Sequence, residues 1–446
     1  MPSIKKQAIV GTIWTIAGHG GSQTLRLVSN LILTRLLVPE LFGLMALVNT
    51  FIIGLNLFSD IGVRGSIIQN KRGEDPVFLN TAWTLQVIRG FGLWLCSLVI
   101  AWPIANFYND QRLLWLVPIV GFTTVIEGFN STAIALLNRN IEIGKLTRFE
   151  FGVKSFGILV MIVWAYFRQT IWALVGGNLL SKLLKMWWSH RLAPEVSNRF
   201  TWDQESLKDL ISFGRWIFIS TAMTFLASQA DRLMLGKLFP LEVLGFYTVA
   251  FTFAELPRGI VQKISNSVMF PVISKYAALP RQELRAKILQ KRWLLLVGLA
   301  IVVTVLVSFG DLIIKLLYDV RYDDAAWMLP ILALGIWPII ISMTINKALF
   351  AIGKSIYIAI GNAFKLIYML IGLPLAFSQW GVLGAIVVIA FNDIPSYIVF
   401  NYGLWREGLT GIGQDIQATV LLIGLISLVV GGRYFLGFGL PIEGIL

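Results

Sequence analysis

The chain has 446 residues, of which 57% are hydrophobic and only 14% are charged, and its mean hydropathy is +0.75. Soluble domains carry about 45–50% apolar and about 25% charged residues, so this composition excludes a soluble protein. The formal net charge of +13 would suit nucleic acid, but in a membrane chain it more often reflects Lys and Arg kept on the cytoplasmic side, and no nucleic acid is expected. The single cysteine, Cys96, and the two histidines, His19 and His190, exclude a disulfide framework and a Cys/His metal site.

Apolar runs separated by polar residues predict twelve membrane spans. Each run approaches or exceeds the roughly 20 residues that cross a bilayer as a helix. The first run is too long for the apolar core of a signal peptide and is expected to stay as a span. A thirteenth apolar stretch, 416–438, and a glycine-rich tail follow, so the sequence predicts an all-α polytopic membrane protein with 12–14 transmembrane helices. The twelve predicted spans are 8–37, 41–69, 77–106, 112–138, 142–167, 170–190, 208–238, 241–272, 293–318, 325–352, 355–377 and 380–405.

Positive residues gather at alternate ends of these spans. Lys and Arg near span ends are retained in the cytoplasm, so this bias places the N-terminus inside. The longest connectors, 191–207 and 276–292, are then cytoplasmic. The second connector interleaves basic and apolar residues, and it is either an amphipathic helix on anionic lipid headgroups or a solvated linker. The basic residues on the predicted cytoplasmic side include Lys5, Lys6, Lys71, Arg72, Arg139, Lys145, Arg191, Arg199, Lys354 and Arg406.

The chain repeats itself at an offset of 202 residues. Residues 33–51 match residues 235–253, and the shared positions include Glu40 with Glu242 and Gly43 with Gly245. Six predicted spans, an even number, separate the copies, so both copies enter the membrane from the same side. This predicts two six-helix lobes related by a pseudo-twofold axis along the membrane normal. The predicted domains are an N-terminal lobe 1–190, a cytoplasmic connector 191–207, a C-terminal lobe 208–405, and an extra helix or helices in 406–446.

Polar residues share one face of several predicted spans, at helical spacing. A charge near the centre of a span costs about 2.5–3.5 kcal/mol on the insertion scale, so several such charges need a wet or paired environment. We therefore expect these faces to line a cavity. They comprise Ser22, Gln23, Arg26 and Asn30 in the first span, Asp60 and Arg64 in the second, Asp231 in the seventh, and Glu255, Arg258 and Gln262 in the eighth.

Cations outnumber acids among the deep positions, and most of these cations are arginines. The planar fork of arginine suits bidentate contact with phosphate oxygens, so an anion such as pyrophosphate is the expected substrate group. Arg26 and Arg258 are expected to approach it from opposite lobes. Lys182 and Lys185 lie toward the inner end of their span, can extend to the interface, and receive no role. The predicted substrate-binding residues are Arg26, Arg64, Arg258, Arg89, Lys365, Gln23 and Gln262, and Lys154 is a further deep cation.

The acidic positions have two interpretations. Asp60 with Arg64, and Glu255 with Arg258, have the spacing of helix ion pairs that only hold the structure together. Alternatively, a mid-span carboxylate takes up H⁺ or Na⁺ and biases two arrangements of the lobes, with no other cofactor involved. The predicted coupling or gating residues are Asp60, Glu127, Asp231, Glu255 and Asp393.

Three segments resemble the signature stretches of bacterial polysaccharide transporters: LFSDIGVRGSIIQ at 57–69, QADRLMLGKLFPLEVLGFYTVAFTFAELPRGI at 229–260, and VMFPVISKY at 268–276. This is the O-antigen and exopolysaccharide flippase family of the MATE-like multidrug/oligosaccharidyl-lipid/polysaccharide exporter superfamily. The resemblance covers most of the chain and implies a V-shaped, two-lobed bundle in the bacterial cytoplasmic membrane. It implies that undecaprenyl-pyrophosphate-linked oligosaccharides are moved to the outer leaflet by alternating access.

The same resemblance bears on residues and partners. Related peptidoglycan-precursor flippases carry functional arginines on the first, second and eighth helices, and Arg26, Arg64 and Arg258 occupy those helices here. The implied partners are the lipid-linked substrate, membrane lipids, and a polysaccharide polymerase with other assembly proteins.

Two other functions compete with this interpretation. A multidrug or cation antiporter of the same superfamily would favour an acidic, aromatic cavity, and the arginine excess argues against it. A membrane-bound glycan polymerase or ligase would be an enzyme, and such chemistry usually needs a substantial outer loop with acid, base or nucleophile, which is not predicted here. No P-loop, G-x-G-x-x-G after a strand, or H-E-x-x-H occurs, so the sequence favours a transporter that is not an enzyme.

Overall fold

The computed structural model describes residues 4–443 apart from 59–62, 141, 266–268, 270–272, 274–275, 277–278 and 355. Helix makes up 83% of the described residues, which contain no strand. The chain divides into two compact units, Met1–Phe225 (unit 1) and Leu226–Leu446 (unit 2). The fold class predicted from composition and apolar runs, an all-α polytopic membrane protein, is confirmed.

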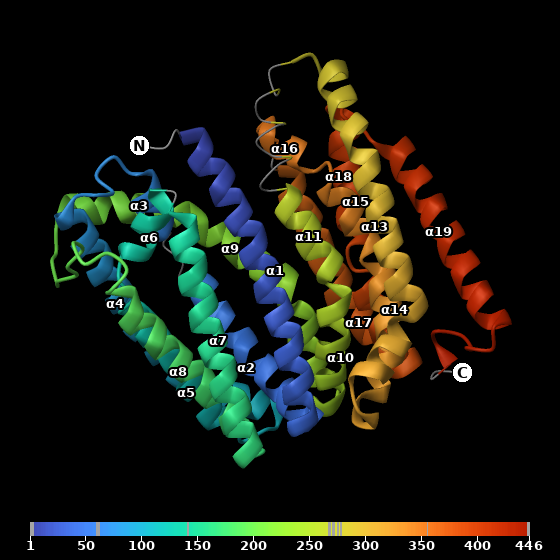
Figure 1. Ribbon diagram of the computed structural model, residues 1–446, viewed down its shortest axis with the longest axis horizontal. Helices are drawn as coiled ribbons and strands as arrows, with labels where there is room; N and C mark the ends of the chain where they lie inside the picture. The colour runs from blue at the N-terminus through green and yellow to red at the C-terminus, as the bar shows by residue number, and fades with distance from the viewer. Residues whose placement is uncertain are drawn as a thin grey trace. The chain divides into compact units, whose positions relative to one another are not determined.

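Unit 1 contains eight described helices and most of a ninth, which runs on into unit 2 (Figure 1). Helix α7 packs against both α1 and α8, and α4 packs along α5. These helices are α1 (Ile4–Leu36), α2 (Pro39–Phe58), α3 (Val63–Gln69), α4 (Pro76–Tyr108), α5 (Leu113–Gly128), α6 (Ala133–Arg139), α7 (Ile143–Phe167), α8 (Ile171–Ser189) and α9 (Gln204–Leu238).

Unit 2 continues with helices that are more often interrupted. Gly381 adopts a left-handed φ of 59° inside α17 and breaks it, at the point where the sequence separates the spans 355–377 and 380–405. The elements are α10 (Leu241–Ala254), α11 (Leu256–Ile264), α13 (Arg281–Leu317), η2 (Val320–Tyr322), α14 (Asp323–Gly335), α15 (Trp337–Met343), α16 (Lys347–Ala351), α17 (Ile356–Ala390), α18 (Ile394–Arg406) and α19 (Ile412–Phe435).

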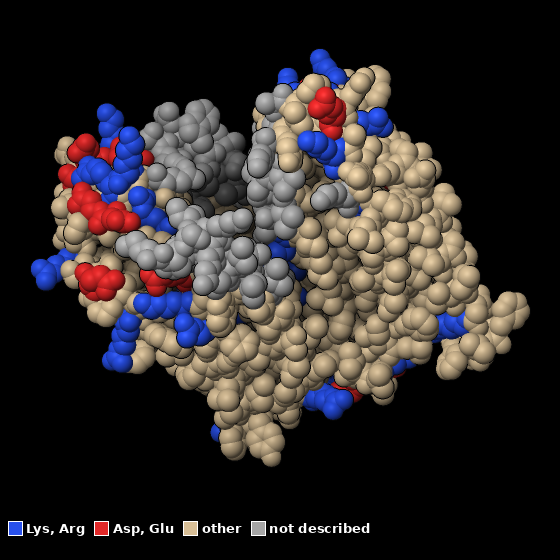
Figure 2. Space-filling view, turned by 45° about the horizontal axis from the view of Figure 1, so that its top comes forward, with Lys and Arg blue, Asp and Glu red and all other residues tan. Residues whose placement is uncertain are grey.

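In the described residues each predicted span lies mostly in helix, but several spans are broken. Within the described chain, seven helical segments are long and apolar enough to cross a membrane, or eight if the bent pair α5 and α6 is one span. That pair bends by 61° between Gly128 and Ala133. On the face drawn in Figure 2, most charged side chains lie near the margins of the view and leave a broad surface with few charges, as expected of a protein that faces lipid.

The sequence repeat recurs in the helix boundaries. Helix α1 ends at Leu36 and α9 ends at Leu238, while α2 begins at Pro39 and α10 begins at Leu241, so both boundaries are offset by 202 residues. The copies thus form the same pair of helices with the same short turn between them. The predicted axis relating the lobes and the predicted domain limits stay predictions.

The two polar connectors differ in structure from a simple linker. Residues 281–292 form the first turns of α13, continuous with the span that follows, rather than a separate helix on the membrane surface. Residues 198–203, which we call the strap, lie along α4. The backbone N–H groups of Arg199, Thr201 and Asp203 donate to side chains of α4, at 3.1 Å to Asn80, 3.0 Å to Thr84 and 3.3 Å to Thr81.

Helix α19 is held to α13 at two levels by buried ion pairs. Near one end, Arg292, which is fully buried, pairs with Asp415, and Tyr397 donates to the same carboxylate at 3.0 Å. Near the other end, both guanidinium nitrogens of Arg433 donate to Asp311 at 2.5–2.6 Å. Four buried charges therefore make the thirteenth predicted span an integral part of unit 2.

Candidate anion-binding site

Three cations converge on a cavity of about 370 Å³ inside unit 1, which we call the Arg64 pocket. Arg64 comes from the first turn of α3, Arg89 from α4 and Lys185 from α8. Glu127 of α5 is the one carboxylate among the lining residues. The remaining polar lining residues are Asn56, Gln86, Thr124 and Asn130.

Close packing of α4 on α5 sets the positions of Arg89 and Glu127. A side chain at Gly90 would lie 2.6 Å from the carbonyl oxygen of Thr124, so the two backbones approach as only glycine permits. The Thr124 hydroxyl donates to the Gly90 carbonyl at 3.0 Å and fixes the register. Arg89 donates from Nη2 to the backbone carbonyl of Asn56 at 2.7 Å, which ties α4 to α2 and steadies the guanidinium beside the cavity.

The charge of Glu127 is already neutralised within unit 1. Lys182 of α8 forms an ion pair with the Glu127 carboxylate, and each side chain is about 30% exposed. Among the described lining residues, the cations Arg64, Arg89 and Lys185 then outnumber the carboxylates. Such a cluster attracts an anion with several charges, and the two guanidinium groups can each bind it through two hydrogen bonds.

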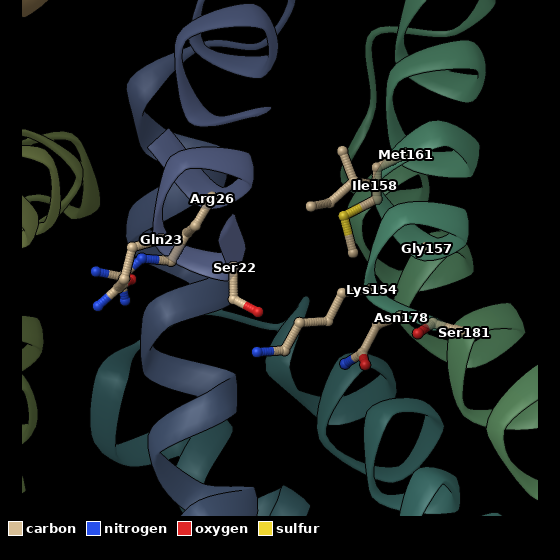
Figure 3. A pocket seen from close by; sticks show the side chains of 9 residues that line it. All are labelled: Ser22, Gln23, Arg26, Lys154, Gly157, Ile158, Met161, Asn178 and Ser181. Atoms are coloured by element: carbon tan, nitrogen blue, oxygen red, sulfur yellow. The ribbon is translucent and has the colours of Figure 1, made fainter. Parts of the chain in front are cut away.

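A second polar cavity in unit 1, of about 420 Å³, lies between α1, α7 and α8 and is called here the Lys154 pocket. Figure 3 shows Lys154 extending from α7 toward α1, with Ser22 pointing back toward it and Asn178 beside it. Gln23 and Arg26 leave α1 on the side away from α7. The other lining residues are Gly157, Ile158, Met161 and Ser181, so no acidic side chain is among the residues that line this cavity.

One face of α8 serves both cavities. Asn178 and Ser181 line the Lys154 pocket, Lys182 holds Glu127, and Lys185 lines the Arg64 pocket. Their spacing of i, i+3, i+4 and i+7 places all four side chains along one side of the helix. The two cavities are thus neighbours along a single polar helix face.

Unit 2 contains a different arrangement, a closed network of two cations and two carboxylates. Arg258 at the start of α11 pairs with Glu255 at 2.9 Å and with Asp393, and Lys365 of α17 pairs with the same Asp393 at 2.7 Å. Asp393 is 5% exposed and Lys365 is 11% exposed. The two positive and two negative charges sum to zero, so this network has no excess charge for a substrate anion.

Asp231 lies near that network but forms none of its ion pairs. Tyr247 donates to one of its oxygens, while the other oxygen, Oδ1, is buried without a hydrogen-bond partner in the described chain. The neighbouring Arg232 turns elsewhere: it donates to Gln229 at 2.7 Å and lies over the ring of Phe251. Asp231 is therefore a buried carboxyl group to which no described cation is paired.

The predicted site residues are not gathered in one place. Arg64, Arg89 and Glu127 line one cavity of unit 1, and Gln23 and Arg26 line the other. Gln262 is exposed on α11, and Asp60 lies outside the described residues. Lys365, for which the sequence offers no local partner, is paired with Asp393. The Glu255–Arg258 pair expected from i,i+3 spacing is present.

A family comparison covers most of the residues of both cavities. The sequence profile described as "Polysaccharide biosynthesis protein" matches residues 32–327, which include both copies of the repeat and most of the Arg64 and Lys154 pockets.

The chain belongs to the polysaccharide biosynthesis protein family.

Individual relatives are distant. The chain is 25% identical over 280 residues to the teichuronic acid biosynthesis protein TuaB of Bacillus subtilis, covering 62% of this chain and 57% of the relative. It is 22% identical to the succinoglycan biosynthesis transport protein ExoT of Rhizobium meliloti, covering 61% and 55%. It is 23% identical to the lipopolysaccharide biosynthesis protein WzxC of Escherichia coli, covering 61% and 56%. The matched part thus spans little more than half the length of these relatives.

Solved structures share the fold. An inward-facing multidrug resistance MATE family transporter of the MOP superfamily has a TM-score of 0.68 at 16% identity, with 86% of this chain and 94% of that one covered. The lipid II flippase MurJ in an inward closed conformation has a TM-score of 0.70 at 13% identity, with 93% and 92% covered. The predicted MATE-like fold is therefore confirmed, and the fold alone favours neither kind of substrate.

Sequence reasoning missed Lys182 and Lys185. Both were interpreted as side chains that extend to the membrane interface, whereas Lys182 neutralises Glu127 and Lys185 lines the Arg64 pocket. A usable signal was present, because Asn178, Ser181, Lys182 and Lys185 share one helix face. Interfacial lysines have no reason to align with uncharged polar residues over two turns.

Proposed function

We propose that this protein is a transporter, and not an enzyme, that moves a lipid-linked oligosaccharide across the bacterial cytoplasmic membrane for the synthesis of a surface polysaccharide. The observation that carries the proposal is the Arg64 pocket: a member of a polysaccharide biosynthesis family gathers Arg64, Arg89 and Lys185 around one cavity. A polyprenyl pyrophosphate linked to sugars is the anion that such a pathway supplies.

The Arg64 pocket suits the pyrophosphate group. Charge-assisted hydrogen bonds to cations contribute roughly 1.5–3 kcal/mol each, and three cations can share the several charges of a pyrophosphate. Lys182 keeps Glu127 from repelling the same group. Arg26 lines the second cavity and not this one.

A multidrug exporter is the competing function, since a MATE family transporter has a similar fold. Cationic drugs need carboxylates or aromatic faces that are free to receive them. The one carboxylate that lines the Arg64 pocket is neutralised, and no aromatic residue lines either cavity. The electrostatics of unit 1 therefore favour an anion.

The orientation, coupling and partners form part of the same proposal. The bias of basic residues at span ends supports an N-terminus in the cytoplasm, with substrate taken up from the inner leaflet. Coupling to H⁺ or Na⁺ is supported best at Asp231, because Glu127, Glu255 and Asp393 are each paired with a described cation. A polysaccharide polymerase and further assembly proteins would receive the exported unit.

Deleting the gene in the source organism tests the function. A flippase predicts loss of surface polysaccharide and accumulation of complete lipid-linked repeat units in the inner leaflet, where an impermeant glycosidase cannot reach them. A polymerase predicts single repeat units that have been exported, and a multidrug exporter predicts unchanged polysaccharide with raised drug sensitivity. Either of the last two results overturns the proposal. Unchanged export after both the proton and the sodium gradients are collapsed would overturn the coupling part alone.

A further inference from the structure

The Lys154 pocket has no place in pyrophosphate binding by the Arg64 pocket, yet it lies beside it along α8. We propose that the Lys154 pocket binds a sugar residue that bears a carboxylate, so that the transported oligosaccharide is acidic. This inference rests on the proposed function and adds to it the class of glycan that is carried.

Between α1 and α7 the charge of the cavity fits one carboxylate, because Lys154 extends into that space and Arg26, the other lining cation, leaves α1 on the side away from α7. Within the described chain Lys154 has no ion-pair partner, and Glu150, one turn earlier on α7, does not pair with it. Its ammonium group extends into the cavity toward Ser22 and Asn178 (Figure 3). A flexible ammonium group is a point charge with three donors, which suits a single carboxylate, whereas the guanidinium forks of the Arg64 pocket suit phosphoryl oxygens.

The remaining lining groups are those that recognise sugars. Ser22 and Asn178 supply a hydroxyl and an amide group that both donate and accept hydrogen bonds, as sugar hydroxyls require. Ile158 and Met161 supply an apolar wall for the C–H face of a sugar ring. The volume of about 420 Å³ lies within the range of about 300–1,000 Å³ typical of small-molecule sites.

The geometry of α8 links this subsite to the pyrophosphate. Asn178 and Lys185 are seven residues apart on one helix face, which corresponds to about 10 Å along the axis. Sugars attached to a pyrophosphate in the Arg64 pocket would therefore extend along α8 toward Lys154. The phosphate of a free lipid headgroup is not covalently linked to a pyrophosphate in the Arg64 pocket, so the Lys154 pocket could recognise it by charge alone.

Binding measurements on the purified full-length protein in phosphatidylcholine nanodiscs distinguish a sugar carboxylate from a lipid headgroup phosphate as the bound anion. The probes are a methyl glucuronide, the matching methyl glucoside, glycerol phosphate and inorganic pyrophosphate. We expect the glucuronide to bind at least about tenfold more tightly than the glucoside, the value of one charge-assisted hydrogen bond. Equal binding of the glucoside, or equally tight binding of glycerol phosphate, would overturn the proposal in favour of a neutral-sugar or lipid-headgroup site.

A pair of variants on neighbouring helix faces provides the control. Lys154→Gln should abolish the preference for the glucuronide and leave pyrophosphate binding unchanged, whereas Lys185→Gln should weaken pyrophosphate binding and keep the preference. Lys154→Arg should retain most of the preference for the glucuronide over the glucoside. If Lys154→Gln leaves the preference intact, the assignment of Lys154 is wrong. If the preference is as expected but deletion of the gene leaves export unchanged, the binding site stands and the proposed function fails.

Discussion

Units 1 and 2 both place charges within membrane-spanning helices, but they use them differently. In unit 1 the cations Arg64, Arg89 and Lys185 surround a cavity whose only lining carboxylate is already neutralised. In unit 2 every charge of the Arg258 network is matched by an opposite one. The sequence positions of the charged residues do not distinguish the two units. The ion-pair partners of those residues do, because they show which charges are neutralised within the structure and which line a cavity.

The difference follows from the cost of removing charge from water. A buried charge is stable when it is paired or wet, and loss of one partner from a buried pair costs about 3–5 kcal/mol. A charge beside a water-filled cavity keeps its hydration, so it can be removed without unfolding the protein. Substitutions in unit 2 should therefore lower the amount of folded protein, while those in unit 1 should lower transport.

The largest expected effect is that of Asp393→Ala. This change leaves Lys365 buried without a carboxylate and removes one of the two partners of Arg258, so we expect a loss of about 3–5 kcal/mol in the free energy of unfolding. Membrane abundance and the thermal unfolding midpoint measure it. Adding Lys365→Met to the variant should restore part of the loss; normal abundance of Asp393→Ala alone would contradict a structural role for the network.

Arg64→Ala should act on transport and spare the fold. Arg64 is exposed at the start of α3 and forms no ion pair with any residue that the structure describes, so its removal leaves no described buried group unpaired. We expect pyrophosphate binding to weaken roughly ten- to a hundredfold, with near-normal membrane abundance. Arg64→Lys should recover only part of the affinity, because it keeps the charge without the fork. Low membrane abundance of Arg64→Ala would instead show that Arg64 stabilises the fold.

A smaller effect, of opposite sign, is expected for Glu127→Gln. Removing this carboxylate frees Lys182 to add a fourth cation to the Arg64 pocket. The pair is about 30% exposed and so resembles a surface ion pair of about 0.2–1 kcal/mol, which corresponds to at most about a fivefold gain in pyrophosphate affinity. The gain should shrink in high salt. Lys182→Gln is the matched control and should weaken binding; the same sign for both variants would refute the electrostatic account.

The smallest effect concerns the strap outside the membrane. The Ser206 hydroxyl donates to Asp203 at 2.6 Å, and with the Ser206 backbone N–H and nearby Arg72 it lowers the pKa of that carboxyl below its ordinary value of 3.8. A lowered folded-state pKa gives stability that is present above pH 3.8 and lost as the pH falls through the folded-state pKa. Amide exchange at Thr201 should therefore be slow and constant from pH 8 to about 5 after correction for the intrinsic rate. An increase at pH 5–6 would contradict this ionisation.

Local patterns in the sequence were sufficient to predict much of the fold and part of the candidate site. Apolar runs predicted the all-α membrane fold, and the offset of 202 residues located matching helix ends at Leu36 and Leu238. The Glu255–Arg258 pair was visible because it depends only on helical spacing. Lys365 with Asp393 and Lys182 with Glu127 are 28 and 55 residues apart, so their pairing depends on how helices pack, which no local pattern encodes.

Helix α9 has a mechanical consequence. Its first turns belong to unit 1, where Glu205 pairs with Arg72 and Asp209 accepts from Asn70, while its last turns carry Asp231, which Tyr247 holds in unit 2. The division between the units falls at Phe225 and Leu226, inside this helix. The segment that connects the units is therefore continuous helix and not an irregular linker, and a helix resists bending and twisting more than an irregular linker of the same length.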